Sequence, residues 1–113
     1  MSGEATLAPM RWWHIESILP IEAELFGREQ WTAPMFWSEL ANGHLYLVAM
    51  GGDAVIGYGG LAMAPPDEAW VQNIGVRRSH QRQGIGRRLL VALLELAERQ
   101  GCRVSDNPAW SSL

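Results

Sequence analysis

The stretch that decides the fold is residues 71–90, which read VQNIGVRRSHQRQGIGRRLL. An apolar run ends at Val76, a polar loop follows, and two glycines, Gly84 and Gly86, then open a new apolar segment. Its apolar residues recur at helical spacing and fall on one face of a helix: Ile85, Leu89, Leu93 and Leu96. The stretch therefore predicts a strand, a loop and a helix in that order.

The start of this predicted helix is suited to binding an anion. The first amides of a helix have no partner within it, and the helix dipole adds partial positive charge there. Glycines let a phosphate approach the backbone closely, because no Cβ intervenes. No Asp or Glu occurs between residues 69 and 94, whereas five arginines do: Arg77, Arg78, Arg82, Arg87 and Arg88. On a chain of net charge -3, this local patch favours a specific small anion over a polyanion such as nucleic acid.

On the glycines alone, an ordinary strand-to-helix turn with a solvated basic face stays an equal alternative, because short glycine patterns recur by chance. Two well-known phosphate motifs do not fit. The chain has a single Gly-x-Gly here without a third glycine three residues on, and it has no Lys for a P-loop.

The six residues 81–86, QRQGIG, resemble the acetyl-CoA signature of the GNAT N-acetyltransferases, and residues 73–76, NIGV, resemble that family's central strand. The resemblance implies an α/β fold with a mixed central sheet flanked by helices, and acetyl-CoA as the acetyl donor. It implies that the main chain of residues 74–76 pairs with the pantetheine arm and that amides of residues 82–87 hold the pyrophosphate. The residues it assigns to acetyl-CoA are Ile74, Gly75, Val76, Arg82, Gln83, Gly84, Ile85, Gly86, Arg87 and, in the tail, Asn107.

Within that family, residues 68–76 and 30–40 look most like the RimI-type protein N-terminal acetyltransferases, and the resemblance extends over about residues 10–100. It implies transfer of acetyl to a protein or peptide N-terminal α-amine, a ribosomal protein being one such acceptor. The amine would attack the thioester directly, without a covalent enzyme intermediate.

The whole chain is consistent with one domain spanning residues 1–113. At 113 residues and 48% apolar it has enough core for a single modest domain. A single Cys, Cys102, excludes an internal disulfide and fits a reducing cytoplasm, and no apolar run reaches the length of a membrane span. The three histidines, His14, His44 and His80, are too scattered for a metal site, so no metal is expected.

Local patterns predict the other elements. They are a first strand within residues 7–12, a helix over 14–26 kinked or divided at Pro20, a helix to 41 capped by Thr32 with Pro34 in its first turn, hairpin strands over 44–50 and 54–63, and a central strand over 69–76.

The tail, residues 101–113, departs from the family pattern, and the C-terminal strands are predicted to be missing. If Asn107 is aligned with the family's asparagine, Cys102 falls where the general-base Glu belongs, and the general-acid Tyr would fall beyond Leu113. The catalytic residues are therefore left unassigned. Two alternatives stay open: a non-catalytic acyl-CoA-binding or interaction module, and an inactive truncated product. A bare sheet edge would also favour a dimer.

Several other residues are weighed as candidates. Glu68 is a possible substitute base, but a solvated loop residue is favoured, and Trp70 occupies the position where some GNATs place a base. Cys102 is interpreted as an incidental buried thiol. A solvated acidic helix face is favoured for Glu22, Glu24 and Glu29 over attraction of a cationic N-terminus. Core or rim packing is expected of the tryptophans Trp12, Trp13, Trp31 and Trp37, with Trp31 bordering the peptide groove.

Overall fold

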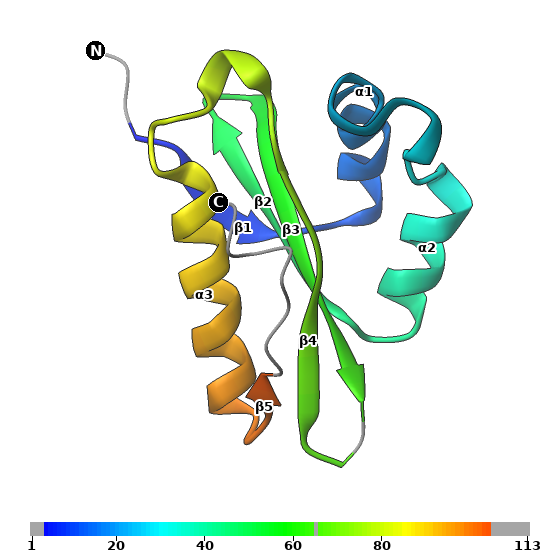
Figure 1. The fold of residues 1–113 in the computed structure, drawn as a ribbon, viewed down its shortest axis with the longest axis vertical. Helices are drawn as coiled ribbons and strands as arrows, with labels where there is room; N and C mark the ends of the chain where they lie inside the picture. The colour runs from blue at the N-terminus through cyan, green and yellow to red at the C-terminus, as the bar shows by residue number, and fades with distance from the viewer. Residues whose placement is uncertain (1–3, 65, 105–113) are drawn as a thin grey trace.

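The computed structural model describes residues 4–64 and 66–104. In these ranges the chain forms a five-stranded sheet with helices on both faces (Figure 1). The elements are β1 (Thr6–Pro9), α1 (Ile15–Phe26), α2 (Ala33–Ala41), β2 (Leu45–Gly51), β3 (Ala54–Ala64), β4 (Glu68–Val76), α3 (Ile85–Arg99) and β5 (Arg103–Val104), with short 3-10 turns at Trp12–His14, Gly27–Glu29 and Arg78–His80.

The sheet is mixed, and its strands lie in the order of the chain. β1 to β4 pair antiparallel, whereas β5 returns after α3 and pairs parallel to β4. A helical crossover is the usual way to bring a parallel neighbour back to the sheet. β5 pairs through only two positions, Glu68 with Arg103 and Ala69 with Val104. The described chain thus contains two residues of a strand that the sequence predicts to be missing. The dimer expected from a bare sheet edge stays a prediction, which light scattering tests.

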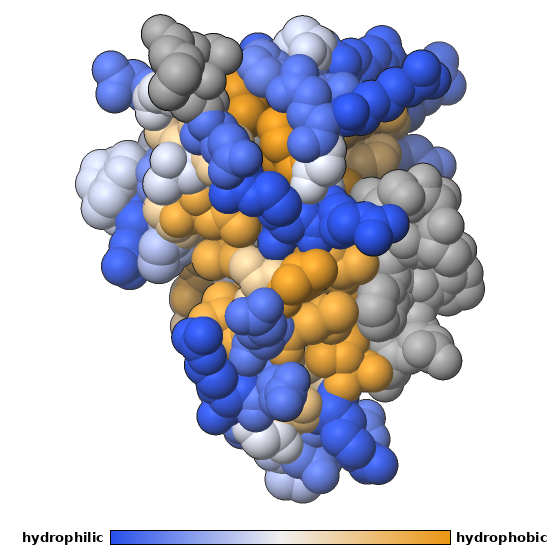
Figure 2. Space-filling model, turned by 90° about the vertical axis from the view of Figure 1, so that its left-hand side faces the viewer, coloured by the Kyte–Doolittle hydropathy of each residue, from blue (hydrophilic) through white to orange (hydrophobic). Residues whose placement is uncertain are grey.

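Each face of the sheet has its own core. α3 packs on one face through Leu89, Leu93 and Ala97, all fully buried, while α1 and α2 cover the other face around Tyr58, Val48 and Phe36 (Figure 1). Viewed from the side where α3 lies, Figure 2 shows a band of apolar residues between hydrophilic residues above and below. Val91 of α3 is 46% exposed, so the helix is apolar on part of its outer face as well.

Two local predictions differ from the structure, and a third is confirmed. α1 continues through Pro20 without division, because Ile15, Ile18 and Ile21 bury one face of the helix and hold both of its halves against the sheet. The first strand ends at Pro9, before the predicted residue 12, since the chain turns where the Arg11 amide donates to Nδ1 of His14. Thr32 and Pro34 begin α2 as predicted.

Candidate functional site

A cavity of about 510 Å³ lies between the end of β4, the start of α3 and one side of α1. Its lining includes eight of the ten residues that the sequence assigns to acetyl-CoA, together with His80, Gln81 and, from α1, Leu25: Ile74, Gly75, Val76, Arg82, Gly84, Ile85, Gly86 and Arg87. Gln83 does not line the cavity, and Asn107 lies outside the described residues. The strand and the loop therefore meet at one hollow, as an extended ligand with a phosphate end requires.

The loop before α3 has a backbone that suits an anion cradle. Gly84 precedes the helix in the left-handed conformation, with φ 81°, and Arg82 is left-handed as well, with φ 65°. The Arg88 amide donates to the Gly84 carbonyl at 3.0 Å, so the amides before it, at the first turn of α3, have no acceptor within the helix. These amides and the helix dipole face the cavity with Arg82 and Arg87 beside them.

Side chains of the same stretch hold the loop in place. Gln81 Nε2 donates to the Val76 carbonyl at 3.0 Å, which ties the loop back to the end of β4. Arg77 donates from Nε to the Val55 carbonyl at 3.1 Å, so its guanidinium supports β3. Gln81 and Arg77 therefore build the cradle, a role that the charge pattern alone did not distinguish from direct anion binding.

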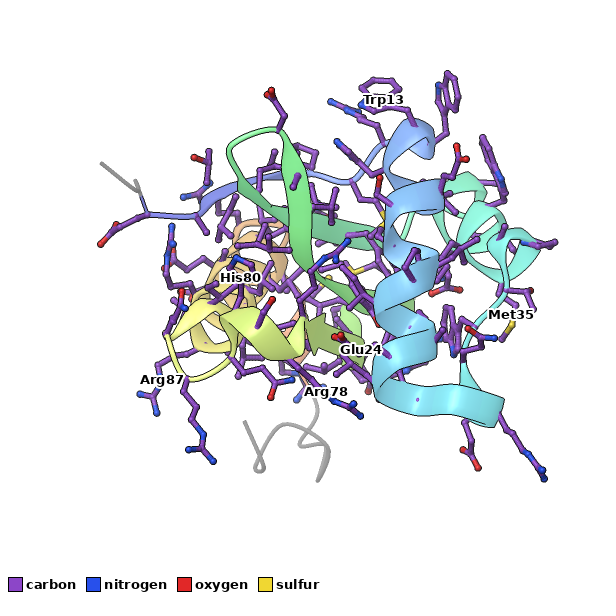
Figure 3. All side chains as sticks on the ribbon, turned by 90° about the horizontal axis from the view of Figure 1, so that it is seen from above. Trp13, Glu24, Met35, Arg78, His80 and Arg87 are labelled. Carbon is purple, nitrogen blue, oxygen red and sulfur yellow. The ribbon has the colours of Figure 1, made fainter. Side chains whose placement is uncertain are left out.

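Glu24 connects α1 to this loop. Its carboxylate accepts a hydrogen bond from the Arg78 amide at 2.9 Å, across 54 residues of sequence. Figure 3 shows Glu24 on α1 facing the 3-10 turn that carries Arg78 and His80, with Arg87 on the first turn of α3. The next residue on α1, Leu25, lines the cavity. The acidic helix thus helps to position one wall of the site.

Glu22 is buried, so the prediction of a solvated acidic face is wrong for this residue. Its carboxylate accepts hydrogen bonds from the Tyr58 hydroxyl and, at 2.7 Å, from the Trp31 amide. Burial raises the pKa of Glu22, and the hydrogen bond from Trp31 offsets part of that rise. The signal was present in the sequence, because Glu22 is four residues after Ile18 and falls on the same helical stripe.

Gly75 is enclosed by the same tyrosine. A Cβ at Gly75 would lie 2.7 Å from the Tyr58 hydroxyl oxygen and 2.8 Å from Cε1 of its ring. Tyr58 itself is fully buried. Gly75 is therefore required where β4 lines the cavity, because the ring occupies the space that any side chain would need.

The remaining candidates lie away from the cavity. Glu68 is exposed and begins β4, eight residues before Val76, which is roughly 26 Å along a strand. Cys102 is partly buried beside the α3 core. His14 and His44 accept backbone hydrogen bonds, from Arg11 and Met63. Nowhere in residues 4–64 and 66–104 do three His, Cys, Asp or Glu side chains gather as a metal site would require.

Three tryptophans are exposed, so the expectation of core or rim packing is wrong for Trp12, Trp13 and Trp37, at 60%, 57% and 47% exposure. They contact one another, with Trp12 and Trp37 stacked at 6.1 Å and Trp12 and Trp13 edge to face at 5.6 Å. Trp31, by contrast, packs against Phe36. The sequence pattern revealed neither that the rings of Trp12 and Trp37 meet nor that they face solvent.

Fold and site together define an acyl-CoA-type acetyltransferase architecture, and the chain belongs to the acetyltransferase (GNAT) family, whose pattern it matches over residues 9–109. The N-alpha-acetyltransferase RimI of Mycobacterium tuberculosis is 44% identical over 82 residues, which cover 68% of this chain and 52% of that protein. The chain thus spans about half the length of this relative.

Solved structures show the same fold. The ribosomal-protein-S18-alanine N-acetyltransferase of Escherichia coli superposes with a TM-score of 0.82 at 23% identity, over 96% of this chain and 72% of that one. The PaiA N-acetyltransferase of Thermoplasma acidophilum, solved in complex with coenzyme A, gives 0.78 at 15% identity, over 97% and 86%. No helix in the described ranges has the length and apolar character to cross a membrane.

Proposed function

We propose that this chain binds acetyl-CoA and transfers the acetyl group to the N-terminal α-amine of a protein. The observation that carries the proposal is the cavity that joins the glycine-opened start of α3 to Gly75 on β4. First-turn amides with Arg82 and Arg87 supply donors and positive charge for a pyrophosphate. β5 pairs only at the beginning of β4, which leaves residues 74–76 without a described neighbouring strand on that side to receive an extended pantetheine arm.

The chemistry proposed is direct attack. The acceptor nitrogen attacks the thioester carbonyl carbon, an N–C bond forms, the C–S bond breaks, coenzyme A leaves as the thiolate, and the nitrogen gives up a proton. The cavity lining contains no Asp, Glu, Cys or Tyr, and apart from its arginines the titratable side chain in it is His80, whose imidazole is able to accept this proton. Holding the amine against the thioester supplies a further part of the rate, because proximity is a large effect.

The absence of an acidic group from this lining favours an α-amine over a lysine as the acceptor. An α-amine with a pKa of about 7.7–8.0 is roughly one tenth free base at pH 7, whereas a lysine with a pKa of about 10.4 is so only to a few parts in ten thousand. The M. tuberculosis relative is named for α-amine acetylation and the E. coli structure for an alanine of a ribosomal protein. These names support a protein N-terminus, including that of a ribosomal protein, as acceptor.

Calorimetric titration with acetyl-CoA tests the donor site. Gly84→Asp introduces both a left-handed non-glycine residue and a negative charge at the cradle, and we expect it to abolish micromolar binding. Gly43→Asp is the matched control, since Gly43 has φ 78° and, like Gly84, no atom within 4 Å of an added Cβ, but lies outside the cavity lining. Equal loss in both variants, or no binding by the folded wild type, contradicts the proposal.

A second candidate, a non-catalytic acyl-CoA-binding module, is favoured by the same lining without a carboxylate and by the two-residue β5. Mass spectrometry of peptides beginning with Ala or Ser, incubated with acetyl-CoA, separates the two. A mass increase of one acetyl group on the α-amine supports the transferase. Tight acetyl-CoA binding without acetylated peptide supports the module.

A further inference from the structure

The α1/α2 side of β4 carries an amide whose hydrogen-bonding groups are unused. Both Nδ2 and Oδ1 of Asn73 are buried and lack a hydrogen-bond partner in the described structure. The neighbouring Gln72 carries the same chemical group, but its Oε1 accepts from the Trp70 indole at 3.0 Å. Buried polar groups are nearly always paired, since an unpaired one destabilises the fold. Asn73 therefore calls for a specific explanation.

The strand register places Asn73 on the face covered by α1 and α2. Asn73 pairs with Gly60 of β3, and directly opposite residues share a face of the sheet. A Cβ at Gly60 would lie 2.2 Å from the ring of Tyr46, which belongs to the core under α1 and α2. Gly75, two residues further along β4, meets Tyr58 of the same core. Asn73 thus lies between two glycines that tyrosine rings cover, next to the strand residue that lines the cavity.

The opposite face of β4 is closed to an acceptor. A Cβ at Gly59 would lie 3.2 Å from both Ile74 of β4 and Leu93 of α3, so helix side chains fill that face. Given the proposed function, an amine that reaches a thioester held along residues 74–76 must then come from the α1/α2 face. Asn73 is a polar side chain of β4 on that route.

The chemistry of a peptide N-terminus matches this amide. The first residue of a peptide offers amine N–H donors and, beyond its Cα, a carbonyl acceptor, whereas a carboxamide offers one acceptor oxygen and one donor nitrogen. We propose that Asn73 binds the first residue of the acceptor: Oδ1 accepts from the amine and Nδ2 donates to the first carbonyl. An amine N–H directed to Oδ1 leaves the nitrogen lone pair free for the thioester.

The unpaired amide of Asn73 lowers the stability of the free protein. Asn73 is half-buried as a residue, yet its two polar atoms are shielded from water. An acceptor that moves aside the covering contacts gains hydrogen bonds without removing water from this amide. Leucine has nearly the same shape and needs no partner. Asn73→Leu should therefore stabilise the free protein and weaken acceptor binding, the reverse of what a structural asparagine predicts.

The experiment compares wild type, Asn73→Leu and Gln72→Leu by thermal melting and by titration with an Ala-starting peptide amide on the chain saturated with coenzyme A. For Asn73→Leu we expect a melting temperature higher by about 4 °C or more and a peptide Kd weaker by about tenfold or more. Gln72→Leu removes a paired amide and should not raise the melting temperature. Prior Nα-acetylation of the peptide should abolish binding to the wild type.

A lower melting temperature for Asn73→Leu overturns the inference without any ligand, and so does an unchanged peptide Kd, which a buried water on Asn73 would produce. Failure of the wild type to bind the peptide while it binds coenzyme A also overturns it but leaves the donor site intact. Failure to bind coenzyme A overturns the proposed function, and this inference with it.

Discussion

The two faces of β4 are both covered by helices, but they are built from different residues. Toward α3 the neighbours are aliphatic, with Leu89 and Leu93 fully buried and Ile74 packed among them. Toward α1 and α2 the strand meets the hydroxyl of Tyr58, the carboxylate of Glu22 beyond it, and the unpaired amide of Asn73. An apolar face contributes stability, whereas a polar buried face costs stability unless every group is paired. Both sides therefore contribute to the core, but only the α1/α2 side of β4 presents buried polar groups, which under the proposed function serve recognition.

The largest effect on stability is expected on the aliphatic face that packs against α3. Leu93→Ala should lower the free energy of unfolding by about 2–5 kcal/mol, because it leaves a cavity in a closely packed core. Val91→Ala, on the same helix at a site 46% exposed, should change it by no more than about 0.5 kcal/mol. Urea unfolding followed by circular dichroism measures both. Similar small losses in the two variants would show that α3 does not hold this face together.

The polar face is tested next at Glu22. Glu22→Ala leaves the Tyr58 hydroxyl and the Trp31 amide without their acceptor, and we expect a loss of about 2–3 kcal/mol. Glu22→Gln keeps an acceptor for Trp31 and should retain most of the stability.

The pH dependence sharpens the same test. Because burial raises the pKa of Glu22, the folded state holds this proton more tightly than the unfolded state does. The resulting stability is fully present below the ordinary glutamate pKa of 4.5 and is lost as the pH rises through the higher pKa of the folded state. The wild type should therefore lose stability relative to Glu22→Gln over that range. A difference independent of pH would contradict the buried, shifted carboxyl.

The same contrast explains which parts of the structure could be predicted from the sequence. The cradle was predictable because its determinants are local: Gly84 sets one left-handed residue, and the apolar repeat behind it sets the helix. The hydrogen bond between Glu22 and Tyr58 could not be predicted, because the two residues are 36 positions apart and only the folded sheet brings them together. The stacking of Trp12 on Trp37 is non-local in the same way, and it leaves both rings exposed where periodicity suggested packing.

Gly75 joins the two faces to the cavity, and an intermediate effect is expected there. Gly75→Ala puts a methyl group 2.7 Å from the Tyr58 oxygen, so the ring must shift, at about 1–3 kcal/mol. Because Gly75 also lines the cavity, acetyl-CoA affinity should fall as well. In the control Gly51→Ala, the added methyl meets only the flexible Ile56 side chain, at 3.3 Å. Thermal melting measures the stability of both variants, and calorimetry measures their affinity for acetyl-CoA. A Gly75→Ala protein with unchanged stability and affinity would show that the Tyr58 ring shifts without cost.

The smallest effect on stability is expected at Glu24, where α1 contacts the 3-10 turn at Arg78–His80. Glu24 lies in the last turn of α1, where a negative charge opposes the helix dipole by about 0.3–1 kcal/mol. Its hydrogen bond from Arg78 offsets that penalty, so Glu24→Ala should change the free energy of unfolding by no more than about 0.5 kcal/mol.

Acetyl-CoA affinity should respond more clearly, falling by about threefold in Glu24→Ala, because the turn at Arg78–His80 loses its tether while His80 lines the cavity. Glu24→Gln keeps an acceptor and should bind as the wild type does, and Glu16→Ala removes the same charge from the first turn of α1 without touching the loop. If Glu24→Ala and Glu24→Gln both bind acetyl-CoA more tightly, repulsion between Glu24 and the phosphates outweighs the tether. The polar face would then limit donor binding, and the role in recognition assigned to the α1/α2 side would have to be revised at α1.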